Sequence, residues 1–244
     1  MLLSLRMKNL YFTVNLNVAA GEYRTKGTNT AFAWLIMRDG VQLAFTIIAD
    51  SSDGIADCRA SYSYILKSFR EWIISVTDIV SSYSFAVRRV IRDVKGLIRG
   101  WNEYMYEHSC NQNGMNASVT ILIATGKHYV LFQTGKGTVS CCTGRGVKVR
   151  VTDGDALGRH SGCVIHVNKG RVRYGDTFVM CRGNRLDDNS LWYIKKLIQK
   201  RKRFTVHHGR GMSGADVVNC ITDRLGCSTT APIAAVLCCE RMEQ

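Results

Sequence analysis

The stretch FTIIADSSDG, from Phe45 to Gly54, places an aspartate at the end of an apolar run. A carboxylate in such a position is typical of a Mg²⁺ or Mn²⁺ site, because hard cations take oxygen ligands. An aspartate in a polar turn is also common for a second reason, since its side chain hydrogen-bonds the local backbone. The sequence therefore leaves two roles open for Asp50: a metal ligand, or a residue that only shapes the turn.

A cysteine nucleophile is the second chemistry to consider, and it needs a neighbouring base. Cys163 has His160 and His166 near it in the sequence. The apolar, strand-like setting of Cys163 favours packing in the core over catalysis. His207 and His208 have no partners at zinc-ligand spacing, and no Gly-x-Ser-x-Gly, Walker or dinucleotide motif is present.

The composition indicates one globular domain. The chain has 244 residues, of which 46% are apolar, and that is enough to bury a large core. Pro232 is the only proline, and no linker-like or repeated segment interrupts the apolar pattern. We therefore expect a single domain over residues 1–244. No apolar run is long enough for a signal peptide or a membrane-spanning helix, so we expect no membrane span.

The ten cysteines do not form a recognisable disulfide framework. Cys141-Cys142 and Cys238-Cys239 are neighbours in strand-like runs, where successive side chains point to opposite faces. No CxxC pair occurs. We interpret the cysteines as small apolar residues in a reducing compartment, which predicts a cytoplasmic location.

The formal net charge of +14 favours an anionic partner: nucleic acid, acidic lipid or phosphorylated protein. The densest basic run, KKLIQKRKRF, extends from Lys195 to Phe204 and is followed by His207, His208 and Arg210. Such a run is typical of a helix that ends in solvated cations. It is also compatible with a surface that binds anions, and the sequence leaves both readings open.

Apolar periodicity predicts the elements that must position these residues. Alternating or short apolar runs predict strands, and apolar residues three and four positions apart predict helices. The predicted strands are residues 10–18, 32–37, 41–49, 119–124, 128–133, 138–142, 147–151, 161–167, 177–181 and 234–239. The predicted helices are residues 62–76, 87–105, 191–199 and 213–226. Short turns between strands imply antiparallel sheets, and helices grouped in blocks imply an α+β fold.

This order of elements, together with four local phrases, resembles the metal-dependent protein serine/threonine phosphatases of the PPM (type 2C) family, especially compact bacterial members. IIADSSDGIADCRAS resembles the family's Asp-Gly-Met-Gly-Gly turn, and SVTILIATGKHYVLFQTGKGTVS resembles the strands that lead to its Gly-Asp-Ser-Arg turn. YGDTFVMCRGNRLDD resembles the strand before its Ser/Thr-Asp-Gly turn, and STTAPIAAVLCC its closing Asp-Asn turn and last strand. The resemblance covers a core of about residues 8–240. It implies a four-layer αββα sandwich, in which two antiparallel sheets are flanked by helix pairs.

The resemblance also implies an active site in which aspartates hold two Mg²⁺ or Mn²⁺ ions that activate water. Of the four metal-binding aspartates, this sequence keeps Asp50. The other positions fall at Ala31, Gly183 and Ala231, and Ala231 is followed by Pro232; Ser51 replaces the glycine after Asp50. Two divalent ions about 4 Å apart repel each other by roughly 4 kcal/mol even in water. Because one carboxylate cannot offset this, no cofactor is expected.

The leading hypothesis from the sequence is therefore a pseudophosphatase: not an enzyme, but a module that binds a protein or phosphoprotein partner. No catalytic residue is assigned, and Asp50 keeps only a residual metal role. Lys136 stands within the segment that replaces the Gly-Asp-Ser-Arg turn, and Arg182 and Arg185 flank the Ser/Thr-Asp-Gly position. These three cations are expected to bind a phosphate group directly. Solvated surface charge is the alternative for each of them.

Two further hypotheses stay open. An active phosphatase with a relocated Mg²⁺ or Mn²⁺ site would draw on other carboxylates. The candidates are Asp50, Asp53, Asp153, Asp155, Asp187 and Asp188. A nucleic-acid-binding protein would use the basic runs at residues 88–99 and 195–210, and its binding would weaken steeply with salt. The chain lacks the interleaved aromatic residues with which single-strand binders stack on bases.

Overall fold

The computed structural model describes residues 10–18, 29–38, 41–50, 59–79, 87–109, 115–125, 128–143, 146–173, 175–182 and 233–241, together with residues 189, 192, 193, 196, 197, 199, 216, 219 and 220. The strands are β1 (Leu10–Val18), β2 (Asn29–Arg38), β3 (Val41–Asp50), β4 (Ser118–Thr125), β5 (His128–Thr134), β6 (Lys136–Thr143), β7 (Gly146–Asp153), β8 (His166–Arg171), β9 (Thr177–Arg182) and β10 (Ile233–Arg241). The long helices are α1 (Arg59–Ile79) and α2 (Val87–Ser109). The described fold is α+β, as the sequence predicts.

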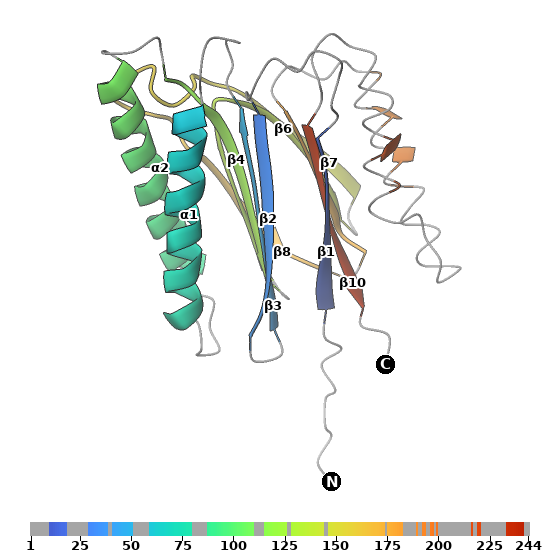
Figure 1. The fold of residues 1–244 in the computed structure, drawn as a ribbon. Helices are drawn as coiled ribbons and strands as arrows, with labels where there is room; N and C mark the ends of the chain where they lie inside the picture. Colours follow the sequence, from blue (N-terminus) through green and yellow to red (C-terminus); the bar gives the residue numbers. More distant parts are fainter. Residues whose placement is uncertain are drawn as a thin grey trace.

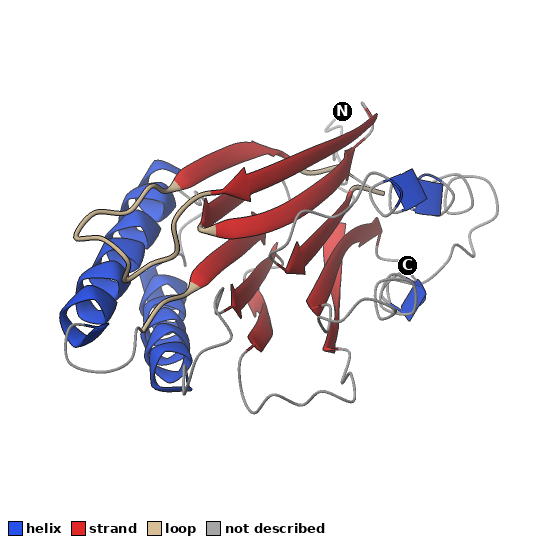
Figure 2. Ribbon diagram, turned by 90° about the horizontal axis from the view of Figure 1, so that it is seen from above, coloured by secondary structure: helices blue, strands red, loops and turns tan. Residues whose placement is uncertain are grey.

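The strands form two antiparallel sheets, which lie face to face. The inner sheet has the order β2-β3-β4-β5-β8, and the outer sheet has the order β1-β10-β9-β6-β7. Both helices cover the far side of the inner sheet, so that helices, inner sheet and outer sheet form successive layers (Figure 1). The view from above shows the same helices along one side of the strands (Figure 2).

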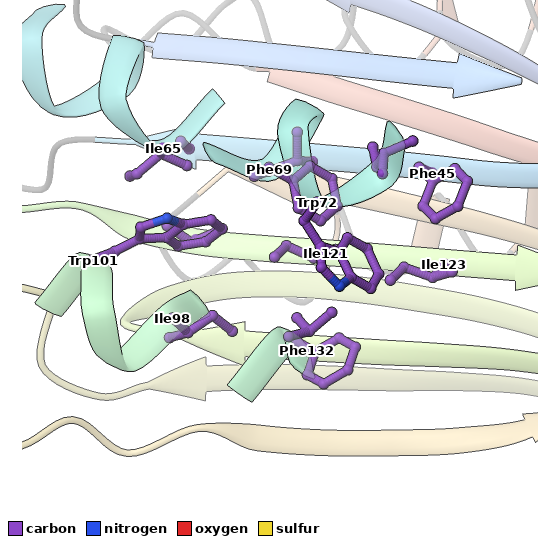
Figure 3. Packing of buried hydrophobic residues seen from close by; sticks show 14 of the residues in the cluster. Phe45, Ile65, Phe69, Trp72, Ile98, Trp101, Ile121, Ile123 and Phe132 are labelled. Atoms are coloured by element: carbon purple, nitrogen blue, oxygen red, sulfur yellow. The ribbon is translucent and has the colours of Figure 1, made fainter. Parts of the chain in front are cut away.

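The inner sheet packs against the helices because apolar side chains alternate along its strands and recur every third or fourth residue along α1 and α2. The cluster includes Phe45, Ile121, Ile123 and Phe132 from the sheet and Ile65, Phe69, Trp72, Ile98 and Trp101 from the helices (Figure 3). Trp101 Nε1 also donates a hydrogen bond of 2.6 Å to Ser68 Oγ, which joins α2 to α1. Truncating a buried ring of this size costs about 3–5 kcal/mol, so this cluster dominates the stability of the helical layer.

A second apolar cluster fills part of the space between the two sheets. Strand β3 contributes to both clusters: Phe45 and Ile47 belong to the helix cluster, whereas Ala44 and Ile48 belong to the cluster between the sheets. Val139 of β6 and Phe178 of β9 meet β3 from the outer sheet. Burial on both faces explains why residues 43–49 are all buried and, except for Thr46, all apolar instead of alternating.

Most predicted elements are confirmed, with boundaries that shift by up to four residues. The predicted strand at residues 161–167 is wrong, because β8 begins at His166. Asn102 of α2 donates hydrogen bonds to the carbonyls of His160 (3.0 Å) and Ser161 (3.2 Å) and accepts one from the N–H of Gly158 (3.0 Å). These bonds hold the chain before β8 in an irregular loop.

The two C-terminal helix predictions fall largely outside the described residues. Residues 192, 193, 196, 197 and 199, and residues 216, 219 and 220, are helical as predicted. Among the described helices, none has the length and apolar character needed to cross a membrane.

Candidate functional site

One edge of the sandwich collects strand ends from both sheets, and we call it the rim. The rim comprises Asp50 at the end of β3, Ser118 at the start of β4, Thr134 at the end of β5, Lys136 at the start of β6, Asp153 at the end of β7 and Arg182 at the end of β9. In the inner sheet, Asp50 pairs with Ser118. In the outer sheet, Lys136 pairs with Asp153, and Arg182 pairs with the residue after Lys136. The structure thus brings Asp50, Lys136 and Arg182 to one edge of the molecule.

Gly135 carries the chain from one sheet to the other at the rim. It is the single residue between β5 and β6, and its φ is +72°. A Cβ at this position would overlap the side chain of Ser118. Only glycine fits, because it adopts positive φ without a steric penalty and leaves room for the neighbouring strand. The crossing therefore depends on glycine at position 135.

Ser118 links the two halves of the rim. Its hydroxyl accepts a hydrogen bond of 3.0 Å from the backbone N–H of Lys136, across the two sheets. Since Ser118 also pairs with Asp50, one residue fixes both strand ends. The sequence analysis did not single out Ser118. Its position just before the apolar run VTILIAT marks a strand end, but nothing in the sequence shows which other strand end it meets.

The space between the sheets is polar next to the rim. Gln133 Nε2 donates a hydrogen bond of 3.5 Å to Thr152 Oγ1, whose hydroxyl donates to the carbonyl of Gly137 at 3.3 Å. The hydroxyl of Thr120 lies so close to Gly137 that a Cβ added to Gly137 would be 2.9 Å from it. Gln133 and Thr120 are buried. This hydrogen-bonded layer links β5, β6 and β7 beneath the rim.

Lys136 and Asp153 form the described ion pair of the rim. Their side-chain atoms Nζ and Oδ1 are 4.0 Å apart, and the two side chains are 48% and 83% exposed. A long, solvated pair of this kind contributes little to stability. The ammonium group of Lys136 therefore remains able to bind a stronger anion, such as a phosphate group, at the same edge.

The other sequence-predicted site residues are not all brought to the rim. Asp155 pairs instead with His160, at 3.5 Å, in the loop after β7. Ala31 lies in β2, opposite Ile48. Several predicted residues lie outside the described residues: Asp53, Asp187, Asp188 and Arg185, and the positions Ser51, Gly183, Ala231 and Pro232.

Among the cysteines whose side chains the structure describes, Cys141 and Cys181 are buried and Cys163 is partly buried. Burial raises the pKa of Cys181 to about 12. Burial also raises the pKa of Cys163, although the Arg99 guanidinium opposes that shift. Both thiols are therefore protonated near neutral pH, and Cys163 packs against the helix cluster. The interpretation of Cys163 as a packing residue is confirmed.

A two-ion centre of Mg²⁺ or Mn²⁺ would need several oxygen ligands from the described side chains. Among them, no group of three or more His, Cys, Asp and Glu side chains converges on one point. Asp153 is exposed and has the ammonium of Lys136 beside it, which disfavours a divalent cation there. The described side chains of the rim do not by themselves fit a two-ion centre.

No family model matches the chain. No relative is found by sequence either. Solved structures match over nearly its whole length. The serine/threonine phosphatase Stp1 from Staphylococcus aureus matches with a TM-score of 0.65 and 9% identity over 96% of each chain. The catalytic domain of the phosphatase PstP, in complex with two manganese ions, matches with a TM-score of 0.60 and 11% identity over 96% of this chain and 99% of that chain. RsbX in complex with magnesium matches with a TM-score of 0.60 and 13% identity over 96% of each chain.

These matches correct two expectations from the sequence. The expectation that the chain is not an enzyme is contradicted, because the structures of the same fold are those of serine/threonine phosphatases. The expectation that no cofactor is used is contradicted as well, because PstP carries manganese and RsbX carries magnesium. The alternative of Mg²⁺ or Mn²⁺ agrees with both. The count of aspartates at the family's fixed positions leaves out carboxylates that follow other strands in the sequence, such as Asp53, Asp187 and Asp188.

At identities of 8–14% the matches show the fold of this chain. They agree with the described layers, in which two helices cover one of two stacked antiparallel sheets. This chain has the fold of the PPM-type serine/threonine phosphatases.

Proposed function

We propose that this chain is a metal-dependent phosphatase that removes phosphate from serine or threonine side chains of proteins, with a metal site rearranged relative to its family. The observation that carries the proposal is the contact between the two sheets at the rim, which we call the joint. Asp50 and Lys136 come from different sheets and are held at one edge through Ser118. Phosphoester hydrolysis needs a site for a metal ion and a contact for the phosphate. In this fold, Asp50 supplies a carboxylate for the first and Lys136 an ammonium group for the second.

Lys136 is the proposed phosphate contact, with Arg182 and Arg185 as further candidates. The Lys136 ammonium is half-exposed, and its described partner is the solvated carboxylate of Asp153. A phosphate group carries more negative charge than that carboxylate and offers more acceptor oxygens, so it competes well for the ammonium. In this role Lys136 orients the phosphate at the rim and offsets its charge.

Asp50 is the proposed centre of the cation site, and Mg²⁺ or Mn²⁺ is the proposed cofactor. Either ion would polarise the phosphate and lower the pKa of a bound water. Asp53 follows Asp50 closely in the sequence, and Asp187 and Asp188 follow β9. These carboxylates are the proposed additional ligands. A sparse ligand set favours one hydrated ion over two, because one or two carboxylates and several waters are enough for Mg²⁺.

We infer that a second pair of helices covers the outer sheet, which would complete the four-layer sandwich in one domain over residues 1–244. Alternate residues of β6 and β9 support this inference. Val139 and Phe178 face the inner sheet, yet the residues that alternate with them are buried as well: Thr138, Ser140, Thr177, Val179 and Cys181. A face of a sheet is buried in this way when another layer covers it.

The proposed substrate is a phosphorylated protein, and the proposed location is the cytoplasm. The protonated, buried thiol of Cys181 is compatible with a reducing compartment. A nucleic-acid-binding role has no support in the matched structures, so it is the weaker reading of the basic surface.

The test is turnover of an aryl phosphate and of a phosphoserine peptide, with Mn²⁺ and Mg²⁺ titrated from zero to millimolar concentrations. We expect turnover that depends on the metal and is abolished by Asp50→Asn. Asp93→Asn, on α2 and away from the rim, is the matched control and should leave turnover unchanged. Turnover that is undetectable at every metal concentration, in a preparation shown to be folded, would refute the proposal.

A further inference from the structure

The outer edge of β8 presents backbone groups that no described strand pairs with. β8 is the last strand of the inner sheet, and in the described part of the chain it pairs with β5 alone. Three of its side chains, His166, Lys169 and Arg171, are exposed. Such an edge is a template for an additional strand from another chain.

Cations border this edge on the side of the helices. Val167 packs against the helix cluster, and Lys169 and Arg171 continue the same alternate set along β8. Helix α2 lies beside the chain that leads into β8, because Arg99 is close enough to influence the pKa of Cys163. Residues at helical spacing from Arg99 share its face. This stripe of cations consists of Arg88, Arg92, Lys95 and Arg99, and Glu103, which also influences the pKa of Cys163, follows it one turn later with the opposite charge.

Two more cations approach β8 from the outer sheet. Thr152 of β7 bonds to Gln133 of β5, so the even-numbered residues of β7 lie on the side of the inner sheet. Lys148 and Arg150 belong to that set. Arg150 is close enough to Tyr129 to oppose the burial that raises the Tyr129 pKa. The Tyr129 ring in turn lies against Gly170 of β8, where a Cβ would be 2.6 Å from it.

We propose that the outer edge of β8 binds an acidic segment of a partner protein as an added strand. Side chains of such a strand would alternate between the α2 stripe and the pair Lys148 and Arg150. Both sides are cationic, so consecutive acidic residues fit, whereas an alternating acidic and neutral segment would satisfy only one side. Because β8 has six residues, the fitting segment is a run of about six consecutive Asp or Glu residues.

A peptide fits this edge better than a nucleic acid does. Backbone hydrogen bonds to β8 are available only to another polypeptide. Stacking on bases would need an exposed aromatic face, and the aromatic ring at this edge, Tyr129, packs instead on Phe178 at 4.8 Å between centroids. The Asp93 carboxylate pairs with Arg92 at 3.1 Å and with Arg89 at 3.5 Å. It therefore competes with an acidic peptide for the α2 stripe, but not for Lys169 or Arg171.

The test is the binding of a fluorescent peptide with six consecutive Glu residues to the full chain at physiological salt, followed by anisotropy. The double variant Lys169→Glu/Arg171→Glu should weaken binding at least tenfold. The matched control Lys67→Glu/Arg70→Glu makes the same charge change on exposed positions of α1 and should change binding less than twofold. A peptide with N-methyl groups on alternate residues keeps its charge but loses backbone donors, and it should bind at least tenfold more weakly.

Three outcomes would overturn the proposal. Equal weakening in the two double variants would mean that only net charge matters. Unchanged binding of the N-methylated peptide would exclude strand addition. Tighter binding of a single-stranded oligonucleotide or of anionic vesicles, sensitive to the same β8 variants, would assign the edge to those ligands instead. If charge reversal prevents folding, Lys169→Gln/Arg171→Gln serves in its place. The peptide carries no phosphate, so the result does not depend on phosphatase activity.

Discussion

The hydroxyl of Ser118 accepts a 3.0 Å hydrogen bond from the backbone N–H of Lys136, although the two residues belong to different sheets. Asp50 pairs with Ser118 within the inner sheet. The buried residue Ser118 therefore sets the position of the strand end at Asp50 relative to the strand end at Lys136. The chemistry proposed for the rim depends on this joint, and the joint can be tested separately from the chemistry.

Replacing Ser118 by alanine should remove the acceptor for the Lys136 N–H. An N–H left without a partner at a partly buried position costs about 1–2 kcal/mol, so we expect a loss of unfolding free energy in that range. Turnover should fall as well, because the start of β6 is no longer fixed. Urea denaturation measures the first effect. Ser63→Ala, at an exposed position of α1, is the control and should change stability by less than about 0.5 kcal/mol.

Replacing Gly135 by alanine should be more damaging. The positive φ alone costs about 1–2 kcal/mol for a residue with a Cβ, and overlap with Ser118 adds a packing cost of about 1–3 kcal/mol. We expect a loss of about 3 kcal/mol in urea denaturation. Gly162→Ala is the matched control, because no atom lies within 4 Å of a Cβ at that position. Similar losses in both variants would show that Gly135 is not constrained by the rim.

The crossing at Gly135 also illustrates what the sequence can and cannot predict. Periodicity located the described strands β1, β3 and β5 and both long helices closely, because each buries a regular set of apolar residues. It could not predict that β5 and β6, one residue apart, lie in different sheets. A short connection between strands normally favours a hairpin, and only the contact of Gly135 with Ser118 shows why this one does not form.

Strand β8 was missed for a different reason. Its sequence, HVNKGR, has few apolar residues, because it lies at the edge of the inner sheet and is largely exposed. The apolar run before it predicts a strand at residues 161–167, yet Val164 is 68% exposed and Asn102 holds the preceding loop in place. At the site, the family resemblance predicts that Asp50 and Lys136 stand at neighbouring strand ends, and both strand ends do meet Ser118 at one edge. It could not show that Asp153 is the partner of Lys136, because that pairing depends on the register of β6 and β7.

Replacing Asn102 by alanine should loosen the loop between β7 and β8. The side chain makes three described hydrogen bonds to backbone groups of residues 158, 160 and 161, and it is buried. We expect a loss of about 2–4 kcal/mol and faster hydrogen exchange at the Gly158 amide. Asn102→Asp keeps the acceptor and loses the donors, so its Gly158 amide should stay protected. Equal exchange at Gly158 in both variants would contradict this division of roles.

The buried thiol of Cys181 should make the protein less stable at high pH. Burial raises its pKa to about 12 from 9.0, so the folded state holds a proton that the unfolded state loses. Its contribution is fully present below pH 9 and decreases as the pH rises toward 12, by about 1 kcal/mol per pH unit. Cys181→Ala should therefore show a shallower fall in unfolding free energy between about pH 9 and 10.5. Tyr129 and Cys163, whose pKa values are also raised, keep their effect in both proteins. Parallel pH profiles would exclude this role of Cys181.

Lys136 and Asp153 give opposite predictions for substrate binding. If Lys136 contacts the phosphate, Lys136→Ala should raise KM for a phosphoserine peptide about tenfold and leave kcat less affected, because a charge-assisted hydrogen bond is worth about 1.5–3 kcal/mol.

Asp153 competes with the phosphate for the same ammonium, 4.0 Å away. Asp153→Asn should therefore lower KM by about twofold, and the difference from the unmodified protein should shrink as salt is added. If Asp153 is instead one of the metal ligands, the same substitution should lower turnover and raise the Mn²⁺ concentration needed for half-maximal activity. Steady-state kinetics of the two variants across a manganese titration thus distinguishes a competitor of the phosphate from a ligand of the metal.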